Sequence, residues 1–190
     1  ERIGWFGWKA DTATLRQFVA EAFRNELGIT SPLAPVDLSS GAADRRRCAG
    51  DHGGLEDDGS LIDAVTAFLA ALPPPAPIAS ERGLALFTSA GCAACHIPGL
   101  PVGRAVVSLY SDLLLHDLGP DLDDKVVQGQ AGGRDWRTTP LWGLSRRSRL
   151  LHDGRARSIG EAIRAHGAAS VQRFHGLSPA ERDELLAFLV

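Results

Sequence analysis

The chain has 190 residues, 44% of them hydrophobic, and 20 Lys and Arg residues nearly balance 23 Asp and Glu residues. This size allows one ordinary core or a small domain with an appendage, and the charge balance argues against a nucleic-acid partner. The longest apolar run, residues 61–72, contains Asp63 and is shorter than the roughly 18 residues of a membrane helix, so we expect no transmembrane segment.

Apolar residues recur at helical spacing in several segments, and no segment has the alternation of a strand. We therefore expect an all-α protein. The pattern predicts helices over residues 11–28, 61–72, 81–91, 158–167 and 178–190. Ser60, Ser80, Ser158 and Ser178 are the predicted N-caps, with Glu161 and Glu181 in capping-box register.

Proline-rich residues 73–77 form the best candidate boundary between two parts of the chain. The first part, residues 1–77, is predicted to be a helical tail with a long loop over residues 29–59. The second part, residues 78–190, has a long irregular stretch between its helices, residues 97–158. A loop of that length needs something besides core packing to organise it, and a large bound cofactor would do so.

The segment "CAACH" contains Cys92, Cys95 and His96 at the spacing of covalent haem c attachment. The two thiols would add to the haem vinyl groups, and the adjacent histidine would supply one axial nitrogen to the iron. A zinc site and a thioredoxin-like dithiol remain alternatives. Zinc would favour a second Cys pair, which the sequence lacks, and the dithiol would favour a βαβ setting.

The second axial ligand cannot be methionine, because the chain contains none. His166 is the preferred candidate, since Ile159, Ala162, Ile163 and His166 share one apolar helix face. His175, His116, Tyr110 and an open position remain alternatives. We expect His152 to make a hydrogen bond near the haem edge or propionates, and we expect no role for His52 in the long loop. Cys48, in the same loop, is either a solvent-side thiol or the partner of a disulfide outside this sequence, and its role is left open. The acidic residues 117–124 could bind calcium or form a solvated loop.

Several motifs in one order resemble the C-terminal part of the di-haem oxidoreductase family, which is related to bacterial di-haem cytochrome c peroxidases. They are "ERIGWFGWKADTATLRQF", "GCAACHIP", "YSDLLLHDLGPDLDD", "WRTTPLWGL", "LLHDGRARSIGEAIRAHG" and "LSPAERDELLAFL". The resemblance implies a periplasmic protein with two cytochrome c domains, in which the C-terminal haem receives electrons and the N-terminal haem handles peroxide. It implies that His166 matches the distal ligand of the C-terminal haem and that Trp8 matches a tryptophan between the haems.

The sequence departs from this family in having a single CxxCH motif. Residues 1–72 would then be the tail of a second cytochrome c-like domain without its own attachment motif. Leu118 stands where relatives often have methionine. Whether the chain is itself an enzyme, with hydrogen peroxide as the substrate of the whole molecule, is therefore left open.

From the motif and the resemblance we expect a cytochrome c-like domain with long haem-wrapping loops and one covalent bis-His haem c. It would be the electron-relay part of a di-haem peroxidase-like oxidoreductase. The alternative is a stand-alone electron-transfer module, or a subunit of a larger redox complex. The expected partner is a redox protein or a second haem domain, on the periplasmic or extracellular side, where haem c is attached. Arg137 and Arg155 are predicted near the propionates, and Trp136 and Trp142 in the pocket wall.

Overall fold

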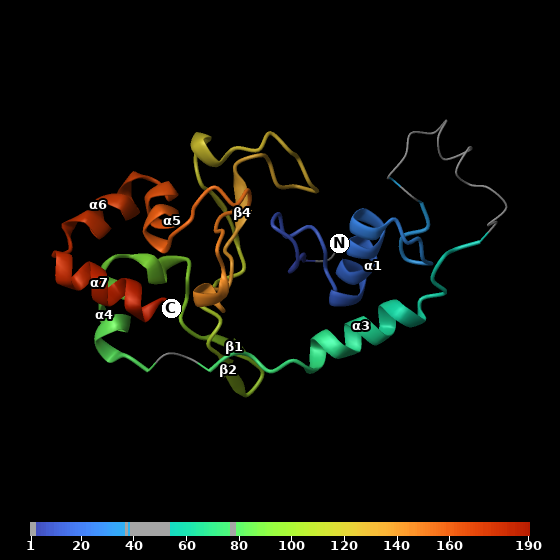
Figure 1. Ribbon diagram of the computed structural model, residues 1–190, viewed down its shortest axis with the longest axis horizontal. Helices are drawn as coiled ribbons and strands as arrows, with labels where there is room; N and C mark the ends of the chain where they lie inside the picture. The colour runs from blue at the N-terminus through green and yellow to red at the C-terminus, as the bar shows by residue number, and fades with distance from the viewer. Residues whose placement is uncertain (1–2, 37, 39–53, 77–78) are drawn as a thin grey trace. The chain divides into compact units, whose positions relative to one another are not determined.

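The computed structural model describes residues 3–36, 38, 54–76 and 79–190, which fall into two compact units (Figure 1). Unit 1 comprises Glu1–Gly7 and Asp11–Pro73, and unit 2 comprises Trp8–Ala10 and Pro74–Val190. Cys48, His52 and most of the predicted long loop lie outside the described residues. In the described part of the chain, no helix is both long and apolar enough to cross a bilayer.

The described part of unit 1 contains the helices α1 (Leu15–Leu27) and α3 (Ser60–Ala71), which pack together through a small apolar core. Val19 and Ala20 of α1 are buried together with Ile62 of α3. The α1 prediction is confirmed with a later start, because the Thr14 hydroxyl accepts a hydrogen bond from the Gln17 N–H and acts as the N-cap.

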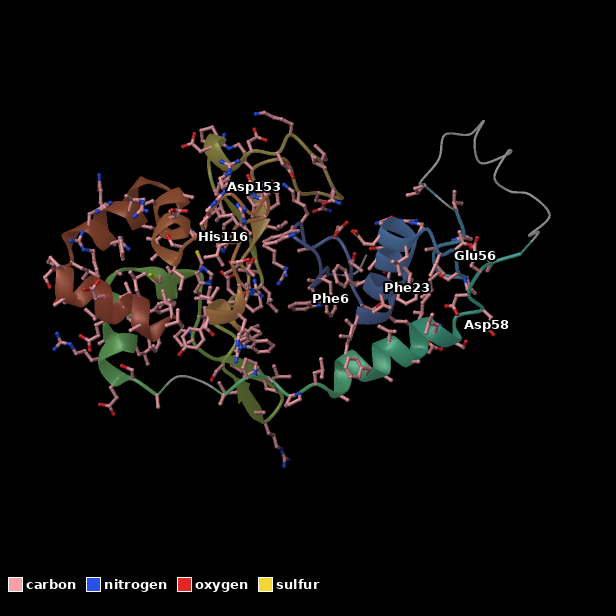
Figure 2. The ribbon with its side chains drawn as sticks, in the orientation of Figure 1. Phe6, Phe23, Glu56, Asp58, His116 and Asp153 are labelled. Carbon is pink, nitrogen blue, oxygen red and sulfur yellow. The ribbon has the colours of Figure 1, made fainter. Side chains whose placement is uncertain are left out.

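The beginning of α3 differs from the prediction, since its N-cap is Gly59 and not Ser60. The buried carboxylate of Asp57 accepts hydrogen bonds from the N–H groups of Leu61 and Ile62, at 3.2 and 3.4 Å. Asp57 therefore satisfies the free N–H groups that Ser60 was expected to satisfy. Figure 2 labels its neighbours Glu56 and Asp58 beside the start of α3.

Among the described residues of unit 2 there are four α-helices, and three of them begin at the predicted serine caps. Helices α4 (Glu81–Ser89), α5 (Ile159–Ala165) and α7 (Pro179–Phe188) start after Ser80, Ser158 and Ser178, and α7 has the complete capping box with Glu181. Helix α6 (Ala168–Gly176) was not predicted. His166 lies one position beyond α5, as its C-cap.

Helices α4 and α7 cross at a close approach in the core of unit 2 (Figure 1). A Cβ atom on Gly83 of α4 would lie 2.7 Å from the Cβ and ring atoms of Phe188 of α7, so only glycine allows this approach. Phe87 and Leu185 complete the contact as buried residues of the same core. This crossing keeps α4, and the cysteine motif that follows it, fixed against the last helix.

The all-α prediction is wrong, because unit 2 also contains two small antiparallel sheets, which make the protein mixed α and β. Strand β1 (Leu100–Val102) pairs with β2 (Ala105–Val107), and β3 (Leu115–Asp117) pairs with β4 (Asp135–Arg137). Each strand has three residues, which is too short to show the two-residue alternation that identifies strands in a sequence. The hairpins and the short 3₁₀ helices η2 (Pro120–Leu122) and η3 (Leu144–Arg146) organise the stretch that looked irregular. A further 3₁₀ helix, η1 (Cys92–Ala94), lies in the cysteine motif before it.

The segment Trp8–Ala10 belongs to unit 2 by its contacts, although its neighbours in sequence belong to unit 1. The N–H of Arg137 in β4 donates a 2.9 Å hydrogen bond to the carbonyl of Trp8. The Lys9 ammonium donates to the carbonyl of Gly132, at 2.8 Å. The segment is thus held against the β3–β4 hairpin.

Candidate functional site

Unit 2 contains a large cleft, whose empty volume out to its open mouth is about 1550 Å³. Its wall comes from α4, the cysteine motif, the β3–β4 hairpin, the turn before α5, and helices α5 and α6. Six of the eight residues predicted for the site line it, which are Cys92, Cys95, His96, Arg137, His152 and His166. The other two, Trp142 and Arg155, are not in the lining.

The cysteine motif forms a tight turn at the end of α4. Gly91 has a φ of 80°, which favours glycine, and η1 follows it directly. The His96 N–H donates to the Cys92 carbonyl at 2.9 Å and closes the turn. Cys92 and Cys95 are free thiols in this turn. Burial raises the pKa of both, and the Asp112 carboxylate adds to the effect at Cys95, so both sulfurs are protonated at neutral pH.

His96 and His166 face each other across the cleft, with their ring centres 6.4 Å apart. Two imidazoles bound to opposite sides of one metal ion, through nitrogens about 2.0–2.1 Å from it, would have ring centres roughly 6.3 Å apart. The two rings therefore have the spacing of a pair of axial ligands.

The second ring nitrogen of each histidine is held by the backbone. Nδ1 of His96 lies 2.9 Å from the Tyr110 carbonyl, and Nδ1 of His166 lies 2.7 Å from the Ala162 carbonyl. A carbonyl only accepts, so both Nδ1 atoms carry the proton, and both Nε2 atoms have a free lone pair in the neutral ring. Burial lowers the pKa of His96, which favours that neutral ring. A carbonyl partner on the distal nitrogen is the usual support of a metal-binding histidine.

A third histidine of the cleft, His116 on β3, makes a different set of contacts (Figure 2). Its Nε2 lies 2.8 Å from the Asp112 carboxylate, and its Nδ1 lies 3.7 Å from the Cys95 sulfur. Among the described residues, Cys95, Asp112 and His116 form the group that could hold a metal ion. The zinc hypothesis would use this group, and it competes with haem attachment for the same sulfur.

Among the described residues, three arginines and no aspartate or glutamate line the cleft. Arg137 of β4 was predicted, and burial lowers its pKa, whereas Arg147 and Arg149 were missed. The run "RRSR" at residues 146–149 was the sequence signal for them. Arg155 instead pairs with Asp153 and donates to the Asp121 carbonyl. The surplus of positive charge suits a ligand with carboxylates.

The tryptophans occupy separate places. Trp136 lines the cleft, and its ring stacks on His152 at 3.7 Å. Trp142 lines a second, smaller cavity beside Tyr110, and its indole N–H donates to the Ser108 carbonyl at 2.7 Å. The alternative ligands Tyr110 and His175 do not line the cleft.

The acidic segment after β3 does not gather its carboxylates into one site. Three of them pair with cations, in the pairs Asp117–Arg134, Asp123–Lys125 and Asp124–Lys9. Each of these three carboxylates is therefore balanced locally, and we do not propose calcium in this segment.

Comparison with protein families gives one match. The family model described as "Di-haem oxidoreductase, putative peroxidase" matches residues 2–190. The chain belongs to the di-haem oxidoreductase family. No curated protein matches the chain in a comparison of sequences. Membership implies redox chemistry and haem as the cofactor, as the sequence motifs had suggested.

Proposed function

We propose that unit 2 is a cytochrome c-like electron-transfer domain with one covalently attached haem. Cys92 and Cys95 would form the thioethers, and His96 and His166 would be the axial ligands. The observation that carries the proposal is the pair of imidazoles 6.4 Å apart, each with its Nδ1 fixed by a carbonyl.

The residues of the cleft fit a haem in three further respects. The two thiols are free and adjacent to His96. Apolar side chains such as Phe87, Leu150 and Ile163 form much of the remaining wall and exclude water. The guanidinium groups of the lining balance the charge of two propionates. When bound, a haem would supply a one-electron iron couple, whose potential depends on its axial ligands and on burial.

The chain's own residues suit electron transfer better than substrate binding. With His96 and His166 both assigned to the iron, no axial position is left for peroxide. The sequence has one CxxCH motif, while the family is named for two haems. We therefore propose the electron-relay role, with the second haem and any peroxide chemistry located outside this stretch of sequence, and with the protein on the periplasmic or extracellular side.

The attachment is tested by denaturing the protein in acidic organic solvent. A covalent haem stays with the polypeptide, and the intact mass equals the chain plus one haem. In denaturant, the thiols of Cys92 and Cys95 should not react with a thiol reagent. Haem extracted into the solvent, or two reactive thiols in this motif, would refute the covalent assignment.

The ligand assignment is tested by His166→Ala, with His175→Ala on α6 as the matched control and His116→Ala for the alternative ligand. EPR and visible spectra of the oxidised protein should change from low spin to high spin only in His166→Ala. A low-spin spectrum retained in that variant would refute the role of His166. One low-spin haem per chain favours the electron-transfer role, whereas an additional high-spin haem favours a peroxidase.

A further inference from the structure

Lys9 is a buried lysine in the wall behind the cleft, and the electron-transfer site just described does not use it. Its side chain is 2% exposed. The ammonium lies 3.2 Å from the Asp124 carboxylate, 2.8 Å from the Gly132 carbonyl and 3.5 Å from the ring centre of Trp136. A cation held at this distance over an indole interacts directly with its π electrons.

Trp136 is enclosed by this contact and by His152. The His152 ring stacks on the indole at 3.7 Å, with 13° between the planes. Two groups this close to the ring centre cannot both lie on the same face of the indole. Lys9 and His152 therefore lie on opposite faces of Trp136. Burial lowers the pKa of His152, so its ring is neutral at pH 7. Lys9 is therefore the cation that acts on Trp136.

Trp8 lies next to Trp136 in a different environment. The two ring centres are 6.4 Å apart and the planes are nearly perpendicular. Trp8 is 44% exposed and Trp136 is 5% exposed. Water can stabilise positive charge on Trp8, whereas Trp136 has an ammonium at its face. The two indoles are close enough to exchange an electron but differ in how readily each one loses it.

We propose that the Lys9 ammonium keeps Trp136 in its reduced form, so that an electron removed from this pair of tryptophans is taken from Trp8. Loss of one electron turns an indole into a radical cation, and the positive charge of Lys9 repels that cation at Trp136. The radical cation is normally relieved by loss of the Nε1 proton. At Trp136, Nε1–H donates to the Leu122 carbonyl at 2.9 Å, which is not a base strong enough to take the proton.

The proposal gives the two tryptophans of this pair different roles in one-electron transfer. Trp8 is the aromatic residue that can take part in one-electron transfer, and Trp136 is a wall residue that does not. Lys9 is thus a positioning residue that acts through Trp136. The inference rests on contacts within unit 2 and does not require the haem assignment.

The azide radical, generated in solution by pulse radiolysis, is a suitable probe. It takes one electron from an indole and becomes azide anion; the indole radical cation then loses its Nε1 proton to water and is trapped by oxygen. Peptide mass spectrometry measures the oxygenated product at each tryptophan. In the unchanged protein we expect product at Trp8 and little at Trp136, and Trp142 serves as an internal reference because it lies outside this cluster.

Two variants give opposite expectations. Lys9→Met removes the cation and should raise the ratio of Trp136 product to Trp8 product about thirtyfold, which corresponds to the roughly 2 kcal/mol of a desolvated cation–π contact. Asp124→Asn keeps the ammonium but removes its counter-charge, and should lower the same ratio. Loosened packing alone would raise the ratio in both variants.

An unchanged ratio in Lys9→Met, or a raised ratio in Asp124→Asn, would overturn the proposal. If Lys9→Met does not fold, the direction of the change in Asp124→Asn still decides the question. Because the measurement follows tryptophan products and not haem spectra, its failure would leave the haem assignment standing.

Discussion

The crossing of α4 and α7 gives the sharpest test of the fold that presents the cysteine motif. Gly83→Ala would place a Cβ atom 2.7 Å from the Cβ, Cγ and Cδ2 atoms of Phe188. Phe188 cannot simply turn aside, because it is 5% exposed and its ring packs on Phe87 and Tyr110, at 5.8 and 6.0 Å between ring centres. One of the two helices must therefore move.

The magnitude follows from two opposing effects. Overpacking a close-packed core costs about 1–3 kcal/mol. Replacing glycine by alanine inside a helix stabilises the fold by about 0.5–1 kcal/mol, because the unfolded chain then loses less conformational entropy on folding. The free energy of unfolding should therefore fall by about 1–2 kcal/mol, which lowers Tm by roughly 2–8 °C for a chain of this size.

Urea and thermal unfolding followed by far-UV circular dichroism measure this change. The matched control is Gly160→Ala in α5, where the nearest atom to the new Cβ is the end of the Arg164 side chain at 3.6 Å. The control should be as stable as the unchanged protein or slightly more stable. If Gly83→Ala has the same stability as Gly160→Ala, the close approach of the two helices is wrong.

Two further changes test the cap of α3 and the ion pair beside the cysteine motif. Asp57→Ala removes the acceptor for two N–H groups and should lower the free energy of unfolding by about 1 kcal/mol. The control Asp58→Ala changes an exposed residue that accepts from one N–H group, and it should lower the free energy of unfolding by less. Equal losses in urea unfolding would argue against the Asp57 cap. At Asp112, burial raises the carboxyl pKa, but hydrogen bonds from Thr138, Leu114 and His116 outweigh it and leave the pKa below its usual value. Such a group stabilises the fold above its unfolded pKa of about 3.9 and loses that contribution as the pH falls through its lower folded value. Asp112→Asn should therefore be less stable than the unchanged protein at pH 7, and the difference should shrink in urea titrations taken to about pH 3; a difference independent of pH would contradict this.

Many of the residues that line the cleft could be named from the sequence because local rules select them. The spacing of Cys92, Cys95 and His96 is a covalent requirement of the proposed attachment. His166 was singled out by an apolar helix face, and it lines the cleft although it lies one residue past the end of α5. Each of these depends on residues near one another in the chain.

The features that sequence analysis did not predict depend on how a segment packs in three dimensions, or are too short to leave a periodic pattern. Arg147 and Arg149 line the cleft while Arg155 does not, and this is decided by how the turn before α5 folds against its neighbours. Ser60 has the right residue type for a cap, but Asp57 reaches the same N–H groups from outside the helix. The strands are held by cross-strand hydrogen bonds, and each strand has three residues, which is too short for a periodic signal in the sequence.

The burial of Lys9 also sets an order of events during synthesis. Its two polar partners, Asp124 and Gly132, follow it by 115 and 123 residues. A growing chain on the ribosome therefore carries this ammonium in water until most of the polypeptide has emerged. Closing so long a loop is entropically costly and comes late, so we expect the wall behind Trp136 to be among the last parts of the molecule to fold.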